Sequence, residues 1–208
     1  LLKGIKKCST EFINGKLLDF GCGSKPYKSL FKVKEYIGLD THNSGHSHKN
    51  ENIDFLYDGK KIPFKDSSFD YIFSSEVLEH VFNINEIMSE LNRVLKIDGK
   101  MLITLPFVWG EHEQPYDFAR YTSFGLKNIL EKNGFEIVQH IKTTTFIETI
   151  FQTLTAYLYH TVVPKGLRTI LTLMLIAPLN LLGIFLGKIL PNDKTYYLNN
   201  IMLCVKKS

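Results

Sequence analysis

The stretch that decides the fold is LLDFGCGSKPY, residues 17–27. Apolar residues flank Asp19, two glycines flank Cys22, and Pro26 follows. A strand that leads into a glycine turn usually holds a nucleotide phosphate, because glycine lets the backbone approach a ligand closely. Here a carboxylate lies at the end of the strand, and proline stands where a dinucleotide loop would carry its third glycine. The stretch therefore indicates a nucleotide-type fold with a different ligand.

Strand and helix patterns alternate on both sides of this stretch. Apolar runs typical of strands buried on both faces lie at 16–20, 35–40, 53–58, 69–75, 100–106, 135–142 and 196–207. This alternation predicts an α/β, Rossmann-like fold with a mostly parallel seven-stranded sheet and helices on both faces.

Two helices are predicted from apolar residues that recur at steps of three and four. The first begins at Ile84 and is expected to close at Asp98-Gly99. The second spans 122–132, with Thr122 or Ser123 as its amino-terminal cap and Gly134 as its stop.

The character of the chain changes after residue 145. Residues 146–190 are rich in Leu, Ile, Phe and Thr, and 169–187 contain no charged side chain. We therefore predict one domain made of residues 1–145 and 191–208, with an apolar helical insertion at 146–190 before the last strand. Pro178 and Asn180 predict two shorter helices that meet near residue 178.

Carboxylates at the strand ends indicate the kind of ligand. Ligands of an open parallel sheet bind beyond the carboxyl ends of its strands. Asp19 would repel a pyrophosphate there but would favour a cation, and S-adenosylmethionine carries an ammonium and a sulfonium and no phosphate. Asp40, seventeen residues after Gly23, can accept hydrogen bonds from ribose hydroxyls, and Asp58 could accept one from the adenine amino group.

Several segments together carry a family resemblance: LLDFGCG, YIGLD, DGKKIPF, and FDYIFSSEVLEHV followed by ELNRVLKIDGKMLITLP. Over about residues 14–142 the sequence resembles the class I S-adenosylmethionine-dependent methyltransferases, in particular the bacterial type 11-like methyltransferase domain family. The resemblance implies that the cofactor S-adenosyl-L-methionine is bound by Asp19, Gly21, Cys22, Gly23, Asp40, Asp58, Gly59 and Ser75.

The polar segment EHEQPYDFARY, residues 111–121, follows the fifth strand. Loops at strand ends often carry function, so we predict that Glu113, Tyr116, Asp117 and Arg120 contact the methyl acceptor. His112 is the candidate general base, and His80, Glu113 and Asp117 are the alternatives. The opposing interpretation is that the segment only leads into the helix that starts near Thr122. Residues 111–126 also resemble a subgroup often met among cell-surface polysaccharide genes.

These features predict a methyltransferase that acts on an O or N acceptor of a small molecule, sugar or lipid-linked glycan. A non-catalytic S-adenosylmethionine-binding or scaffold protein stays an alternative, since its binding residues would look identical. A nicotinamide-dependent oxidoreductase is disfavoured by Asp19 and Pro26.

The pairing expected in this fold family places the strands at 135–142 and 196–205 together at one sheet edge. A single membrane crossing by the insertion would separate them, so we predict that 146–190 lies at a membrane surface or in a homodimer interface. Lys165, Arg168 and Lys188 flank the apolar run, as expected near anionic headgroups. The alternative is that its helices cover the sheet edge and bury their leucines.

Composition limits the partners. The net charge of +4 over 208 residues comes from scattered Lys and Arg, which argues against nucleic acid. Cys8, Cys22 and Cys204 have no disulfide or zinc spacing, so we expect a cytoplasmic protein, with peripheral contact to the inner face of the membrane as an option. His42, His46 and His48 lie in a polar loop, and no metal is predicted.

Overall fold

The computed structural model describes residues 1–41 and 52–207. The chain divides into two compact units, Leu1–Ile141 with Asn200–Ser208, and Lys142–Asn199.

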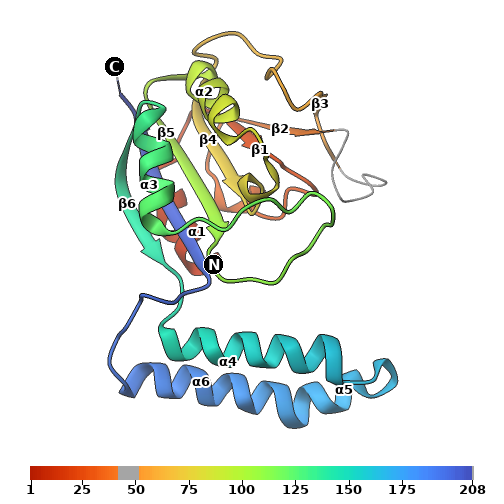
Figure 1. The fold of residues 1–208 in the computed structure, drawn as a ribbon. Coiled ribbons are helices and arrows are strands. Elements are labelled where there is room, and N and C mark those ends of the chain that lie inside the picture. Colours follow the sequence, from red (N-terminus) through yellow and green to blue (C-terminus); the bar gives the residue numbers. More distant parts are fainter. Residues whose placement is uncertain (42–51, 208) are drawn as a thin grey trace. The chain divides into compact units, whose positions relative to one another are not determined.

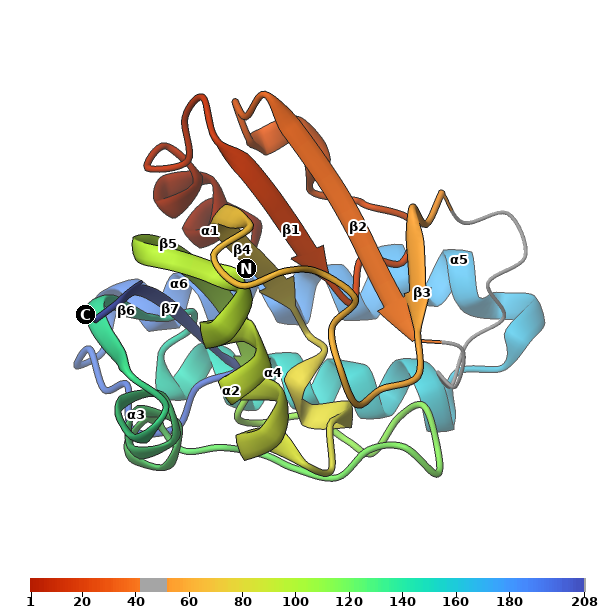
Figure 2. The same ribbon diagram turned by 90° about the horizontal axis from the view of Figure 1, so that it is seen from above.

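The first unit is built on a seven-stranded sheet (Figures 1 and 2). Its strands are β1 (Lys16–Phe20), β2 (Glu35–Thr41), β3 (Phe55–Tyr57), β4 (Phe69–Ser75), β5 (Leu95–Pro106), β6 (Phe135–Lys142) and β7 (Asn199–Lys206). Their order is β3-β2-β1-β4-β5-β7-β6, and the pairs β1–β2, β1–β4, β2–β3 and β4–β5 are parallel. The predicted fold class is confirmed, and the last two strands are neighbours at one edge, as expected.

Helices cover both faces of this sheet because neighbouring strand residues point to opposite sides. Leu18 packs in a core cluster with residues of α2 (Ile84–Val94) and α3 (Ser123–Lys132). Leu17 packs in a second cluster with residues of α1 (Leu2–Ser9). The helix α1 has no counterpart among the predicted elements.

The two predicted helices are present, with one difference in their ends. Thr122 caps α3 by accepting a hydrogen bond from the Gly125 N–H, as predicted. The helix α2, however, ends at Val94, and β5 begins at once at Leu95. The pair Asp98-Gly99 therefore lies inside β5, where the register with β4 is shifted by a bulge.

The second unit consists mainly of two packed helices. The helix α4 (Phe146–Tyr157) begins with a capping box formed by Thr145 and Glu148. It contacts α6 (Ala177–Ile189) along its length. A Cβ atom added to Gly183 would lie 2.5 Å from the Phe151 Cβ, so glycine is what allows the helices to approach so closely.

The predicted break near residue 178 is wrong. Helical structure continues from Lys165 through α5 (Arg168–Leu171) and a π-helical turn to the end of α6, and the chain reverses near Pro164. Pro178 lies in the first turn of α6, directly after the π-helical turn Thr172–Ile176. Such a turn tolerates a residue without a backbone N–H, so proline can follow it without ending the helix.

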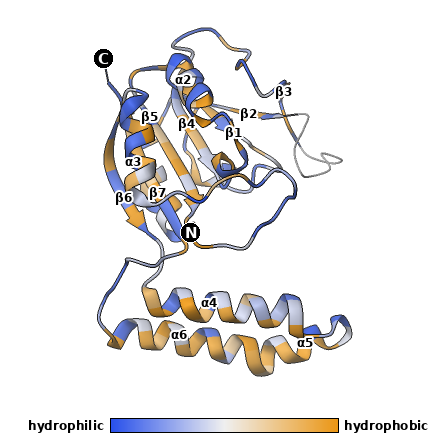
Figure 3. Ribbon diagram, viewed as in Figure 1, coloured by the Kyte–Doolittle hydropathy of each residue, from blue (hydrophilic) through white to orange (hydrophobic). Residues whose placement is uncertain are grey.

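The helices of the second unit consist largely of apolar residues (Figure 3), and many of these side chains are exposed. By length and composition alone, Lys165–Ile189 could cross a membrane. Leu173, Met174 and Leu181 are 68%, 74% and 65% exposed. Large apolar side chains exposed together in this way typically mark an interaction surface.

Candidate active site

A cavity of about 330 Å³ opens at the carboxyl ends of β1, β2 and β4. This is the position where open parallel sheets bind ligands, and the volume suits a small ligand. The described residues that line it are Asp19, Phe20, Gly21, Cys22, Gly23, Ser24, Pro26, Tyr27, Asp40, Thr41, Tyr57, Phe73, Ser75, Glu76, Val77, His80, Val81, Glu113 and Tyr116.

The glycine loop after β1 forms one end of the cavity. Gly21 has a φ of +72°, and a Cβ atom there would lie 2.4 Å from the methyl groups of Val77. Asp40 holds the loop, because its carboxylate accepts hydrogen bonds from the N–H groups of Gly23 and Thr41, both at 2.8 Å. Glycine is therefore required at position 21 because a larger residue would clash with Val77. The Asp40 carboxylate links β2 to the glycine loop through its hydrogen bonds.

Asp19 lies beneath this loop and is almost fully buried. Its carboxylate accepts a 2.6 Å hydrogen bond from the Tyr36 hydroxyl. Burial raises the pKa of Asp19 to about 7, although the bond from Tyr36 opposes the shift. Burial also raises the pKa of the Cys22 thiol, which therefore stays protonated. Asp19 can thus act as a carboxylate whose ionisation responds to a nearby cation.

The other end of the cavity is formed by His80, Glu113 and Tyr116. The Tyr116 carbonyl oxygen lies 2.9 Å from Nδ1 of His80, and a Glu113 carboxylate oxygen lies 3.7 Å from its Nε2. The segment 111–121 thus brings polar groups to the end of the cavity opposite Asp40.

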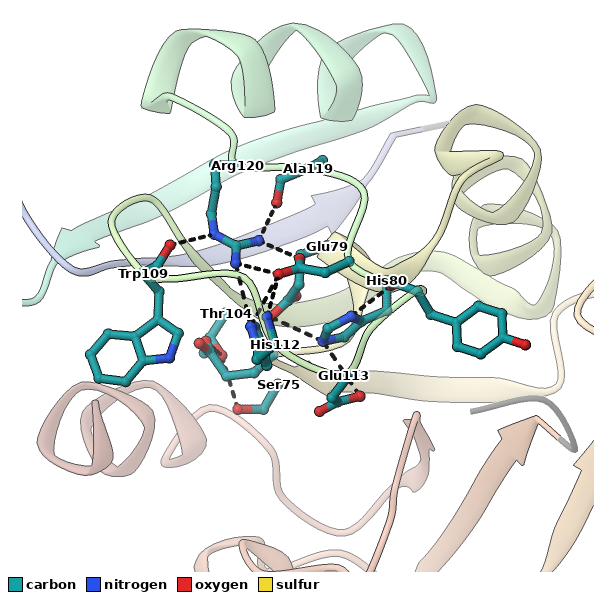
Figure 4. A network of polar contacts seen from close by, with 12 residues as sticks. Ser75, Glu79, His80, Thr104, Trp109, His112, Glu113, Ala119 and Arg120 are labelled. Carbon is teal, nitrogen blue, oxygen red and sulfur yellow. Dashed lines mark hydrogen bonds and ion pairs between the residues drawn. The ribbon is translucent and has the colours of Figure 1, made fainter. Parts of the chain in front are cut away.

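His112 and Arg120 lie near His80 (Figure 4), and Asp117 contacts both His112 and Arg120. Arg120 donates hydrogen bonds to both carboxylate oxygens of Asp117, which holds the pKa of Asp117 well below its usual range. Arg120 also donates to the carbonyl oxygens of Trp109 and Gly110. These contacts fix the shape of the segment, and none of His112, Asp117 and Arg120 lines the cavity.

Glu79 is the most deeply buried acid of this region, with no exposed surface. Neither of its carboxylate oxygens has a hydrogen-bond partner among the described residues. Burial raises the pKa of Glu79 to about 8. Its backbone carbonyl accepts hydrogen bonds from the N–H groups of Phe118 and Ala119, which ties the segment after β4 to the 111–121 segment.

The structure brings most of the predicted site residues together, but not all of them. Lining the cavity are Asp19, Gly21, Cys22, Gly23, Asp40, Ser75, His80, Glu113 and Tyr116; outside its lining lie Asp58, Gly59, His112, Asp117 and Arg120. The Asp58 carboxylate accepts from the Lys60 and Lys61 N–H groups, which makes it a turn residue here. His42, His46 and His48 lie outside the described residues.

Sequence reasoning did not identify the apolar walls of the cavity. Phe20, Phe73 and Val77 line it, and the sequence signal was available, since each lies at or just after a strand that ends in the site. Tyr27 is a different case, because only packing against Phe73 brings it there.

The lining fits S-adenosylmethionine better than a dinucleotide. Two carboxylates, Asp19 and Asp40, face this space, and no Lys or Arg occurs among the described residues that line it. A pyrophosphate would meet repulsion there, whereas an ammonium and a ribose diol would meet acceptors. Fold and site together define the class I S-adenosylmethionine-dependent methyltransferases.

Comparison with known proteins agrees with this class. The sequence model of the methyltransferase domain family matches residues 1–140, and the chain belongs to this family. The cofactor of the family is S-adenosylmethionine. Phosphoethanolamine N-methyltransferase 2 of Caenorhabditis elegans is 33% identical over 104 residues, which cover 45% of this chain and 24% of that protein. An uncharacterized protein of Methanocaldococcus jannaschii is 27% identical over 146 residues, covering 66% of this chain and 70% of its own length.

Solved structures share the fold at low identity. Haemonchus contortus phosphoethanolamine N-methyltransferase 2, in complex with phosphomonomethylethanolamine and S-adenosylhomocysteine, has a TM-score of 0.61 and 18% identity. The match covers all of this chain and 52% of that one. A putative methyltransferase from Haloferax volcanii, in complex with a methyltransferase activator, has a TM-score of 0.62 and 13% identity, covering 99% and 89%. The chain thus spans about half of the first solved enzyme and about a quarter of the Caenorhabditis relative.

Proposed function

We propose that this protein transfers the methyl group of S-adenosylmethionine to an O or N acceptor on a small molecule, sugar or lipid-linked glycan. The observation that carries the proposal is one cavity with two different ends, the glycine loop with Asp40 at one and His80 with Glu113 at the other. The cofactor, when bound, supplies a methyl group activated by its sulfonium, and the C–S bonding electrons stay on sulfur as the acceptor lone pair forms the new bond.

The residues around the glycine loop would hold the cofactor. Asp40 is placed to accept from ribose hydroxyls with the lone pairs that the Gly23 and Thr41 N–H groups leave available. Asp19 would face the ammonium. Ser75 is held in place by Thr104, 2.9 Å away, and would line the methionine portion.

The other end would position the acceptor and receive its proton. An acceptor that loses a proton needs a base within hydrogen-bond reach. His80 and Glu113 line the cavity, whereas the His112 ring packs against the His80 ring at a centroid distance of 4.8 Å. The acceptor proton would therefore reach Nε2 of His80 or the Glu113 carboxylate first, and His112 would act through His80. The apolar wall, including Phe73 and Val77, would exclude water.

Two acceptor classes have support. The relative named phosphoethanolamine N-methyltransferase favours a small amine. The resemblance of residues 111–126 to enzymes of cell-surface polysaccharide genes favours a sugar hydroxyl. Both classes place a polar acceptor group beside Glu113. The assay must therefore include amine acceptors and sugar acceptors.

The test uses S-adenosylmethionine with a labelled methyl group and a panel of phosphoethanolamine, simple sugars and lipid-linked glycans. We expect label transfer to one class. With that acceptor, His80→Ala should lower turnover by about 10²- to 10⁴-fold, and His112→Ala should lower it by less, while S-adenosylhomocysteine affinity stays near wild type in both variants. The exposed His160, in the other unit, gives the matched control His160→Ala, which should leave turnover unchanged. Tight cofactor binding without transfer to any acceptor would favour the non-catalytic alternative.

We also propose a cytoplasmic protein whose residues 146–190 lie at the inner membrane surface, with a second copy of the chain as the alternative partner. The support is the exposure of large apolar side chains in α5 and α6 and the flanking charges of Lys165, Arg168 and Lys188.

A further inference from the structure

We propose that Glu79, His80 and His112 bind a divalent transition-metal ion at the acceptor end of the cavity. Each residue offers one ligand atom, and these atoms lie within 4.8 Å of one another (Figure 4). The inference deepens the proposed function, because the ion would hold the acceptor, but metal binding itself is measured without turnover. It departs from the sequence prediction of no metal, which weighed only the histidines at 42, 46 and 48 as ligands.

The carboxylate of Glu79 is the strongest sign of a missing ligand. It is fully buried, and both oxygens lack a hydrogen-bond partner among the described residues. A buried carboxylate without partners is costly, and buried acids are normally paired, hydrogen-bonded or bound to a metal. The nearest imidazole nitrogen, Nε2 of His80, lies 3.8 Å away, which is too far for a hydrogen bond.

Both histidines are oriented as metal ligands usually are. Nδ1 of His80 lies 2.9 Å from the Tyr116 carbonyl oxygen, which leaves its Nε2 buried and without a hydrogen-bond partner among the described residues. The Glu113 and Glu79 carboxylates lie 3.7 and 3.8 Å from this nitrogen.

Nδ1 of His112 lies 3.3 Å from the Gly110 carbonyl oxygen and 3.2 Å from the Asp117 carboxylate, with Nη2 of Arg120 also 3.3 Å away, so these contacts occupy Nδ1 and leave the other ring nitrogen for an ion. A metal-bound histidine typically donates its second N–H to a carbonyl or carboxylate in this way.

The nearby guanidinium does not serve as the partner of Glu79. Arg120 directs both terminal nitrogens to Asp117, at 2.5 and 2.6 Å, and its remaining contacts go to backbone carbonyls and the His112 ring. Arg120 therefore neutralises the carboxylate that orients His112 and leaves the Glu79 oxygens available.

The donor set indicates the class of ion. Two imidazoles and a carboxylate suit zinc and similar transition metals, and a site with three protein ligands keeps a position open. Magnesium prefers oxygen ligands and should bind weakly. Ligands about 2.1 Å from a tetrahedral ion lie about 3.4 Å apart, so atoms now up to 4.8 Å apart would approach by up to about 1.4 Å. The partly exposed ring of His112 is the one that can rotate.

The open position would face the acceptor. His80 and Glu113 both line the cavity, so an ion on Nε2 of His80 lies at its wall. A divalent ion there would bind an acceptor oxygen and lower the pKa of its hydroxyl. Because the ion would occupy Nε2 of His80, the Glu113 carboxylate would then be the group that takes the acceptor proton.

The test is metal binding by the untagged full chain after removal of metals with a chelator. Calorimetric titration with ZnCl₂ should give one equivalent per chain, with metal counted by elemental mass spectrometry, and MgCl₂ should bind far more weakly. His112→Ala should weaken zinc binding by about 100-fold or more, since even outer partners of metal ligands are worth 10- to 100-fold. Bound Co²⁺ should give visible absorption bands that change in Glu79→Gln. S-adenosylhomocysteine binding and circular dichroism show that each variant is folded.

Two controls locate the ion. His160→Ala removes a histidine of the other unit, and a triple change of His42, His46 and His48 to Gln removes the polar-loop histidines. Both should keep one equivalent of zinc. Wild-type protein that binds no stoichiometric zinc, binding unaffected by His112→Ala, or binding lost only in the triple variant would each overturn the proposal. None of these results depends on whether an acceptor has been found.

Discussion

At the scale of single residues, Asp40 and Asp19 end neighbouring strands but have different surroundings. Asp40 uses both oxygens to hold the N–H groups of Gly23 and Thr41. Asp19 accepts from the Tyr36 hydroxyl and lies deeper. Asp40 therefore holds the loop before a ligand arrives, whereas Asp19 gains its charge most readily when a cation is present.

The first prediction concerns Asp40. Asp40→Ala should weaken S-adenosylhomocysteine binding by about 1–3 kcal/mol, because ribose hydroxyls lose an acceptor and the loop loses its bridge. Asp58→Ala is the matched control, since Asp58 does not line the cavity. Calorimetry should show a loss for the first variant and near wild-type affinity for the second. Equal affinities in both variants would remove Asp40 from the site.

The second prediction is a pH dependence. Burial raises the pKa of Asp19 to about 7 in the free protein, and an ammonium beside it would lower that pKa in the complex. Because binding then releases a proton, affinity should increase as pH rises from about 6 towards 7 and level off above it. Asp19→Asn should flatten this profile. Affinity for S-adenosylhomocysteine that is independent of pH in wild type would show that the ammonium binds elsewhere.

Residue roles were only partly predictable from sequence. Asp19 and Asp40 stood out because each lies at the end of an apolar strand. Asp58 also follows an apolar strand, yet its side chain closes a local turn, and nothing in the sequence separates these two uses of an acid at a strand end. The contact between the His80 and His112 rings depends on how the loop after β5 folds back, which sequence spacing does not encode.

At the scale of elements, the close packing of α4 and α6 depends on small residues. Gly183 faces Phe151, and a Cβ atom on Gly187 would lie 2.7 Å from Cγ of Glu148. Thr155 also donates a 2.9 Å hydrogen bond to the Asn180 side chain. Two glycines four residues apart thus let the apolar helices α4 and α6 pack closely. Small residues with this spacing allow the same close packing between membrane helices.

The third prediction tests this packing. Gly183→Leu should destabilise the helix pair by about 1–3 kcal/mol, because the added side chain overlaps the backbone-proximal atoms of Phe151. Gly166→Ala is the control, since a Cβ there meets nothing within 4 Å. Hydrogen exchange in α4 and α6 should accelerate only in the first variant. Unchanged protection in Gly183→Leu would mean that the two helices do not pack as described.

Elements were predictable where a periodic apolar pattern coincides with burial. The strands β1, β2, β4, β5 and β7 and the helices α2 and α3 meet that condition, whereas β3 and β6 were predicted although most of their residues are not buried. The helix α1 was missed because its sequence LKGIKKCS carries glycine and three lysines and is stabilised by packing of Ile5 and Cys8 under the sheet. Pro178 was wrongly predicted to break the helix. The π-helical turn just before it changes the local hydrogen-bond pattern, so the helix continues although proline has no N–H to donate.

At the scale of the whole molecule, the site lies entirely in the unit that contains the sheet, while the exposed apolar helices belong to the other unit. The membrane proposal can therefore be tested without touching the cavity.

The fourth prediction concerns this second unit. Full-length protein should float with liposomes of anionic lipid, and a version with 146–190 replaced by a short linker should not, because it lacks the exposed apolar side chains and the flanking Lys and Arg. Both versions should bind S-adenosylhomocysteine. Full-length protein that ignores liposomes but is dimeric by light scattering would support the second-copy alternative, and a monomer that ignores them would contradict both.

The central claim is that the cavity beside Asp19 and Asp40 holds S-adenosylmethionine. The most direct measurement is calorimetric titration of the full chain with S-adenosylhomocysteine and, separately, with NAD. We predict binding of one S-adenosylhomocysteine per chain and no measurable binding of NAD, because the described lining offers carboxylates and no Lys or Arg for a pyrophosphate. Binding of NAD in the absence of S-adenosylhomocysteine binding would contradict the account.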